Sequence, residues 1–304
     1  MGVLSVCKRV LWRPGVALVV LTGCLRAQGM STVPAWQKEA GDKMEFEVAS
    51  IRPDQGPFRS PSFALSSDDW FRDPQGHFHA DFSVATYIEF AYKLWLTGEQ
   101  RKEMLAAVPA WVSSDRYAIE ATAPLHATKD QYRLMMQALL ADRFKLAIHF
   151  TEKEEPVLAM VLVKKDTTGP KLIPHDKGPS CDETPGPEVF PETCYSFSAY
   201  PKDGHSMAGS RGNSMAAIGN FLGSMGGRMS EISRPVVDQT GLTGKWDFSL
   251  EVGQPFGGAR PDGPPAEGPT LLEAVQEQLG IKLKPTKAML QVPVVDHVDR
   301  PSEN

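Results

Sequence analysis

Apolar residues recur at helical spacing after Ser83, and again after Ser214. The first set lies on one face of a helix: Val84, Tyr87, Ile88, Ala91 and Leu94. Adding 131 to each position gives a second set, in which four members are apolar and one is glycine: Met215, Ile218, Gly219, Leu222 and Met225. Because the apolar stripe keeps its phase, the pattern predicts two helices with corresponding buried faces.

The correspondence extends beyond these helices, so that residues 76–164 are echoed loosely at 204–299. A strand-like segment and a second helix follow in each copy. Both second helices open with the spacing of a capping box, which pairs Thr128 with Gln131 and Thr270 with Glu273. Gly280 is a suitable C-terminal stop for the later helix.

Each copy is expected to close with two strands of its own. In the first copy these strands turn around residues 152–156, and in the second they turn around residues 285–288. The element order is then strand, helix, strand, helix, strand, strand, twice. This order predicts an α+β fold in which two related units, 45–165 and 204–300, pack as one body.

Three irregular segments interrupt this plan. A loop after the first expected strand carries four aromatic residues, Phe58, Phe63, Trp70 and Phe71, and either folds back on the body or faces a ligand. Residues 166–203 form a proline-rich linker between the units. Residues 253–269 are rich in Gly and Pro and predict a disordered insert in the second unit.

The N-terminus has the order of an export signal. A basic stretch precedes a short apolar run, and Leu25-Arg26-Ala27 resembles a cleavage site, so residues 1–27 are interpreted as a signal peptide. The run is too short for a membrane-spanning helix. Leu21-Thr22-Gly23-Cys24 also resembles a bacterial lipobox, which would make Cys24 a lipid anchor. Both alternatives predict an exported protein, periplasmic or extracellular.

The remaining cysteines and the charge agree with export. Cys181 and Cys194 are the only cysteines after residue 27, and in an oxidising compartment they are expected to form a disulfide. Loss of residues 1–27 removes four basic residues and no acid, which leaves 28 basic and 37 acidic residues and a net charge of −9. A nucleic-acid partner would need a basic face, so this class is disfavoured.

Few residues suggest catalysis. His77 and His79 share one strand face with metal-ligand spacing but lack an evident third ligand, so strand histidines are the favoured interpretation. The adjacent Asp296 and His297 point to opposite faces of a strand. A strand ending at Asp238 is expected to lead into a turn in which Asp238 and Thr240 bond local backbone and glycines supply positive φ, at Gly241 and Gly244. No cofactor motif is present.

Several segments together resemble one family. They are Phe46–Pro53, Leu139–Leu146, Pro235–Phe248 and Val295–Asn304. The chain is similar to the large paralogous family of exported proteins of unknown function that is abundant in soil Acidobacteria. That resemblance implies export and one fold over the mature chain, and no activity. The repeated unit also resembles, more weakly, the short N-terminal domain of secretins and TonB-dependent receptors, a periplasmic interaction module.

These features favour a non-enzymatic binding or interaction module of the cell envelope, with a protein or peptide partner held by strand addition or in a groove. The alternative is a secreted hydrolase with an undiagnosed site, for example a metal site at the His77/His79 strand.

Overall fold

The computed structural model describes residues 33–41, 43–182, 186, 189–202, 205–229, 232–253 and 268–301, without the side chains of residues 226–229. Residues 33–304 form one compact unit. The expected signal peptide, Cys24 and most of the expected insert lie outside the described residues. Within them the protein combines helices with open sheets, as the α+β prediction requires.

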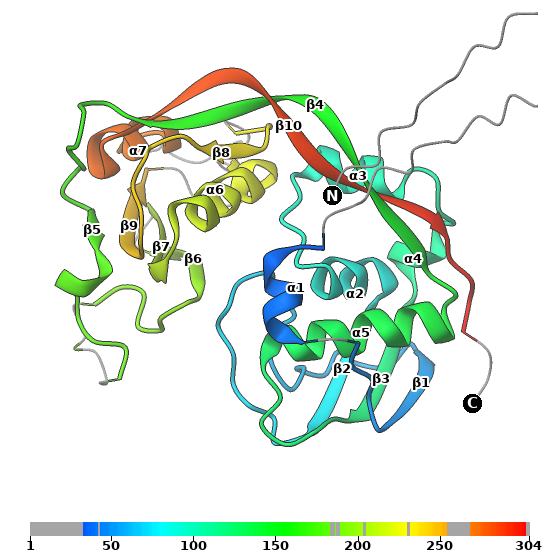
Figure 1. Cartoon of the computed structure of the whole chain (residues 1–304). Coiled ribbons are helices and arrows are strands. Elements are labelled where there is room, and N and C mark those ends of the chain that lie inside the picture. The colour runs from blue at the N-terminus through cyan, green and yellow to red at the C-terminus, as the bar shows by residue number, and fades with distance from the viewer. Residues whose placement is uncertain are drawn as a thin grey trace, which may run out of the picture. The chain divides into compact units, whose positions relative to one another are not determined.

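The first sheet has the order β1-β3-β2 and is antiparallel throughout. Its strands are β1 (Val48–Asp54), β2 (His77–Ser83) and β3 (Arg116–Thr122). Helices α2 (Val84–Ala91) and α5 (Lys129–Arg143) lie on one side of it (Figure 1). Three further helices precede or follow α2: α1 (Ala35–Ala40), α3 (Gly98–Leu105) and α4 (Trp111–Ser114).

The second sheet has the order β5-β9-β7-β6. Its strands are β5 (Leu172–Pro174), β6 (Phe197–Lys202), β7 (His205–Asn213) and β9 (Trp246–Val252). Its helices are α6 (Met215–Met229), which directly follows β7, and α7 (Leu271–Leu279), which packs on β9. The strand before α6 therefore pairs with the strand before α7, just as β2 pairs with β3 in the first sheet.

The two sheets also agree in detail. Phe82 of β2 pairs with Tyr117 of β3, and the echoed positions pair as well, Asn213 with Trp246. The hydroxyl of Ser83 accepts the Thr86 N–H at the start of α2, and Ser214 accepts the Ala217 N–H at 3.2 Å at the start of α6. Gly280 ends α7 in a left-handed conformation with φ of 70°.

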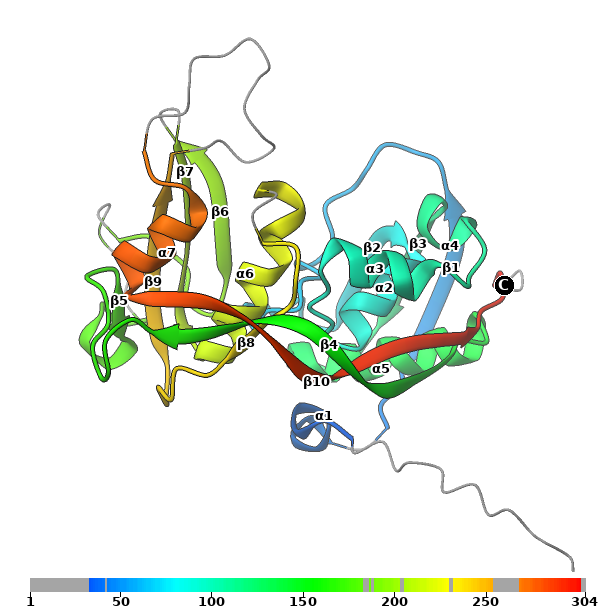
Figure 2. The same cartoon turned by 90° about the horizontal axis from the view of Figure 1, so that it is seen from above.

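The expected closing hairpins are wrong. Each copy ends in one long strand, β4 (Ala147–Leu162) and β10 (Ile281–His297), and these two strands pair with each other, Leu162 with Ile281 at one end and Ala147 with His297 at the other. Figure 2 shows them as one twisted ribbon. The physical reason lies in the expected turns, since residues 152–156 and 285–288 contain no Gly, Asn or Asp to adopt the positive φ that tight hairpins need.

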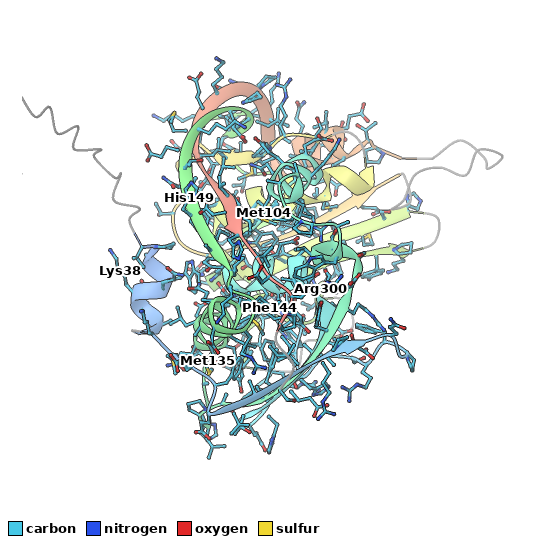
Figure 3. The ribbon with its side chains drawn as sticks, turned by 90° about the vertical axis from the view of Figure 1, so that its right-hand side faces the viewer. Lys38, Met104, Met135, Phe144, His149 and Arg300 are labelled. Carbon is cyan, nitrogen blue, oxygen red and sulfur yellow. A yellow bond between two sulfur atoms is a disulfide. The ribbon has the colours of Figure 1, made fainter. Side chains whose placement is uncertain are left out.

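The paired strands β4 and β10 each contribute buried residues to the core of the other copy. Val295 and Val298, at the end of the chain, are buried in the first core with Met135 and Phe144 (Figure 3). Met160, near the end of β4, is buried in the second core with Ile281. The short strand β8 (Val236–Asp238) pairs in parallel with this part of β4. Each core thus depends on a strand from the other copy.

The linker prediction needs correction as well. Residues 166–203 contain β5, the single-turn 3₁₀-helix η1 (His175–Lys177) and β6, so part of this segment belongs to the second sheet. Sheet pairing of the short runs Leu172–Pro174 and Phe197–Lys202 outweighs the many prolines, which stand mainly between them. The segment also contains the predicted disulfide between Cys181 and Cys194.

The capping boxes give a first testable expectation. Thr128 and Thr270 each accept an N–H at 3.2 Å, from Gln131 and Glu273, and both boxes are reciprocal. Thr128→Ala and Thr270→Ala should each lower the free energy of unfolding by about 1 kcal/mol. Urea unfolding checks this, with Thr128→Ser and Thr270→Ser as controls that keep the cap. A loss in the Ser variants equal to that in the Ala variants would argue against capping as the cause.

Candidate functional site

A groove of 500 Å³ is lined by residues of both copies. One wall is the loop Leu65–Asp68 together with residues 94–96, which follow α2. The opposite wall comes from β6 and α6 and includes Phe197, Phe221 and Met225. Concave surfaces of this size that combine apolar walls with a few polar groups are the usual form of a ligand site.

Three aromatic side chains line the groove. The rings of Trp95 and Phe197 meet edge to face with centroids 5.4 Å apart, and Phe197 stacks on Phe221 at 4.6 Å. Trp95 and Phe197 are only half-buried, whereas Phe221 is buried against Phe248. The two half-buried rings therefore offer apolar surface that is already held in place by the ring behind them.

Two carboxyl groups stand beside these rings. Asp68 is 9% exposed, and its Oδ1 accepts from the Ser66 hydroxyl at 2.7 Å. Glu89 of α2 accepts from Arg101 Nε at 2.6 Å, and burial raises the pKa of Glu89. The groove therefore joins aromatic surface to an acidic side.

Two buried cations of α5 fix the wall formed by residues 65–68. Lys129 Nζ donates to the Asp68 carboxylate at 2.9 Å, to the Asp68 carbonyl at 2.8 Å, to the Ser66 hydroxyl at 3.0 Å and to the Trp70 carbonyl at 3.0 Å. The fully buried Arg133 donates to the carbonyls of Ser66 and Asp68. These bonds satisfy backbone that would otherwise be buried without partners, so the groove has a rigid wall.

The aromatic loop largely folds back on the body. Phe63 is buried and meets Phe71 edge to face at 4.9 Å, inside the first core. Phe58, which precedes Phe63 in the same loop, is 56% exposed. The short segment 65–68 is the part of the loop that lines the groove.

The predicted histidine pair lies elsewhere. His77 and His79 line a separate hollow of 440 Å³ on the first sheet. Both ring nitrogens of His79 are engaged, Nδ1 with the Ser62 hydroxyl and Nε2 with the Ser60 carbonyl, each at 2.8 Å. Within the described part of the chain, the one group of three His, Cys, Asp or Glu residues with metal-ligand spacing does not include them.

The segment around Asp238 forms a turn in the structure. Asp238 Oδ1 accepts from the Thr240 N–H at 2.9 Å and from its hydroxyl at 2.7 Å, while Gly241 and Gly244 have φ of 74° and 83°. Asp296 and His297 have separate partners: Asp296 contacts His149 across the ribbon at 2.7 Å. These residues do not line the groove.

Sequence reasoning missed Trp95, Phe197 and Lys129. The two aromatic residues carry no motif, and their proximity depends on the tertiary fold. Lys129 did carry a signal, because it occupies the first position of α5, where a positive charge opposes the helix dipole. A cation there indicates a nearby acidic partner.

A second polar feature lies on each sheet, on the face away from the helices. Asp81 of β2 is 1% exposed and lies 3.2 Å from Arg116, and Asp247 of β9 is 6% exposed and lies 3.8 Å from Arg211. Nearby stand Asp54, the last residue of β1, in the first copy and His175, the first residue of η1, in the second. Asp54 pairs with Arg116, and the His175 N–H donates to the Lys245 carbonyl, so each partner directly precedes the aromatic residue of β3 or β9. Both copies thus bury one carboxylate beside one further titratable group.

With this geometry the chain is an α+β protein that has a groove and lacks a recognised cofactor motif. The model of a family described as protein of unknown function (DUF3738) matches residues 85–298, and the chain belongs to that family. No curated protein and no solved structure matches it significantly. Among the described residues, every helix is too short or too polar to cross a membrane.

Proposed function

We propose that this protein is an exported binding module of the cell envelope, and that its groove holds a segment of a protein or peptide partner. The observation that carries the proposal is the pair of half-buried rings, Trp95 and Phe197, set beside Asp68 and Glu89 in a cavity of 500 Å³. The net charge of −9 expected for the mature chain disfavours a nucleic-acid partner. The expected export signal favours a partner outside the cytoplasm.

The groove favours a particular ligand chemistry. An apolar side chain can pack on Trp95 and Phe197, and a positively charged side chain can approach Glu89. Hydroxyls of Ser67, Thr86 and Ser224 also line the groove and can bond a peptide backbone. The preferred segment therefore places an aromatic or aliphatic residue next to Lys or Arg.

A displayed library of linear peptides tests this proposal. Selection on the full chain should enrich sequences with an apolar residue beside Lys or Arg. Trp95→Ala should weaken the binding of an enriched synthetic peptide at least tenfold, because truncation of an aromatic anchor commonly costs more than 1.4 kcal/mol. Glu89→Gln should weaken it less, and only for cationic peptides. Fluorescence anisotropy gives the dissociation constants.

Phe58→Ala is the matched control, since Phe58 is an exposed aromatic residue that does not line the groove. Thermal unfolding shows whether each variant keeps its fold. Equal binding of the peptides to wild type and to a folded Trp95→Ala variant would refute the groove as the binding site.

A specific observation keeps the secreted hydrolase as a second candidate. The carboxyl groups of Asp54 and Asp81 lie on either side of Arg116, at 3.5 Å and 3.2 Å from its guanidinium nitrogens; burial raises the pKa of Asp81, whereas a bond from the Gly56 N–H lowers that of Asp54. Asp54 lines a hollow of 440 Å³ with Tyr117 and Arg300. Carboxyl pairs with pKa values moved apart serve acid–base catalysis. Hydrolysis of ester, glycoside or peptide substrates that disappears in Asp54→Asn would support this candidate.

A further inference from the structure

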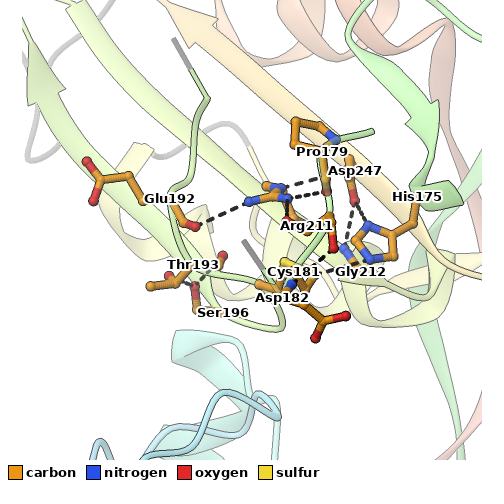
Figure 4. Close-up of a disulfide and its surroundings, with 12 residues drawn as sticks. His175, Pro179, Cys181, Asp182, Glu192, Thr193, Ser196, Arg211, Gly212 and Asp247 are labelled. Carbon is orange, nitrogen blue, oxygen red and sulfur yellow. Dashed lines mark hydrogen bonds and ion pairs between the residues drawn. A yellow bond between two sulfur atoms is a disulfide. The ribbon is translucent and has the colours of Figure 1, made fainter. Parts of the chain in front are cut away.

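A half-buried histidine lies against the disulfide in the second copy. His175 Nε2 is 3.3 Å from Cys181 Sγ, and Cys181 is bonded to Cys194 (Figure 4). One ligand atom from each of His175, Cys181 and Cys194 can be chosen so that all three lie within 4.8 Å of one another. This is the spacing from which a metal ion can be held.

A buried carboxylate orients the imidazole. Asp247 Oδ1 accepts the backbone N–H of Gly212 at 2.7 Å and lies 2.6 Å from His175 Nδ1. Because this oxygen is an acceptor, Nδ1 carries the donated proton and the lone pair of the neutral ring is on Nε2. Hydrogen bonding of the distal nitrogen to a carboxylate is the arrangement that metal-binding histidines use.

The disulfide makes little use of Nε2. With the proton on Nδ1 the ring has no N–H at Nε2, and a disulfide sulfur has no proton to give, so the contact of Nε2 with Cys181 Sγ, its one partner among the described residues, is not a hydrogen bond. The structure therefore holds a metal-ligand atom in position next to two sulfurs that cannot ligate while they are bonded to each other.

Arg211 holds the cysteine loop independently of the disulfide. Its guanidinium is 2% exposed and donates to the carbonyls of Pro179 and Ser180, just before Cys181, and to that of Glu192, two residues before Cys194. Opening the disulfide leaves these bonds in place, so both cysteines remain near His175.

From this arrangement we infer that the disulfide is the metal-free state of a redox-controlled site for a soft metal ion such as Zn²⁺. Two thiolates and an imidazole are ligands that Zn²⁺ prefers, and three protein ligands leave one position open. The site is independent of the proposed groove, with which it shares no residue.

The chemistry requires a dithiol reductant. Its thiolate attacks one sulfur of the disulfide to form a mixed disulfide, and its second thiol then displaces the protein sulfur, so the reductant leaves as a disulfide. Two electrons and two protons pass to Cys181 and Cys194. Binding of a divalent metal then releases the two thiol protons. The exchange runs in reverse with a small-molecule disulfide as oxidant: it accepts two electrons from the two thiolates and leaves as a dithiol, the Cys181–Cys194 bond forms again, and the metal ion is released.

Cobalt(II) titration of the full chain tests the inference. Protein is reduced with dithiothreitol, freed of reductant without oxygen, and titrated with Co²⁺. Reduced wild type should show thiolate-to-cobalt charge-transfer absorption that saturates at one equivalent and disappears on addition of Zn²⁺, whereas oxidised protein should show none. His175→Ala and Asp247→Asn should each weaken binding at least tenfold.

His149→Ala is the matched control, because His149 also contacts a carboxylate, that of Asp296 at 2.7 Å, away from the sulfurs. Reduced wild type that stays folded by circular dichroism without the absorption overturns the inference, as does equal binding by His175→Ala. If reduction unfolds the chain, Zn²⁺ must restore the fold, and failure to do so overturns the inference too.

Discussion

Ending the chain after Lys284 is expected to unfold the first copy, although residues 45–165 would all remain. The removed residues include Val295 of β10 and Val298 just after it, and both are buried in the first core. Each buried valine contributes about 1.5 kcal/mol or more, and the removed half of the ribbon takes its backbone pairing with it. Since a domain of this size is stable by only about 5–15 kcal/mol, the loss should be decisive.

Further contacts tie the end of the chain to the first copy. The Asp299 N–H donates to the Phe144 carbonyl at 2.7 Å, at the end of α5. Arg300 pairs with Asp115 at 2.9 Å and lies 4.9 Å from the centre of the Trp111 ring. All of these would be lost with the truncation.

Hydrogen–deuterium exchange measures the outcome. Amides of α5 should lose their protection in the truncated chain and keep it in a control chain that ends at Pro301, which retains every contact just described. Val295→Asp should reproduce the loss with a single change, because it buries an unpaired carboxylate. Full protection of α5 in the chain ending at Lys284 would mean that the first copy closes its own core.

The local parts of this fold could be predicted from the sequence. Thr128, Thr270 and Gly280 act within a few residues of their own helices, so their spacing is sufficient. The pairing of β4 with β10 could not be predicted, because either a hairpin or an exchanged ribbon satisfies the same alternating strands. The lack of a turn residue at 152–156 was the available signal against a hairpin.

The candidate groove was beyond sequence reasoning for a different reason. Asp68, Trp95, Phe197 and Met225 span more than half of the chain, and only the tertiary fold brings them to one cavity. The disulfide could be predicted because only two cysteines follow the expected signal peptide, but His175 and Asp247 beside it could not. Their residue types are common and their separation in sequence is long.

Lys129→Met is expected to lower the free energy of unfolding by about 3 kcal/mol at pH 7. It removes the three N–H donors that serve four nearby acceptors and leaves the buried Asp68 carboxylate without its cation, and breaking a buried ion pair typically costs 3–5 kcal/mol. Lys287→Met is the control, because Lys287 forms an exposed pair with Glu154 at 2.9 Å and should cost at most about 1 kcal/mol. Urea unfolding at fixed ionic strength measures both.

The pH dependence of the stabilities of wild type and Lys129→Met separates the effect of the Lys129 charge from that of its packing. Burial lowers the pKa of Lys129 to about 8, below its value of 10.5 in the unfolded chain. Between these values the unfolded chain binds more protons, so the contribution of Lys129 to stability rises with pH, by up to about 3 kcal/mol. Lys129→Met lacks this contribution.

Burial raises the pKa of Tyr132 to about 12, so that group titrates above the window in both folded chains. The stability of wild type minus that of Lys129→Met should therefore increase from pH 7.5 to pH 9.5. A difference that stays flat or falls over this range would show that the ammonium group keeps an ordinary pKa in the fold, held charged by Asp68.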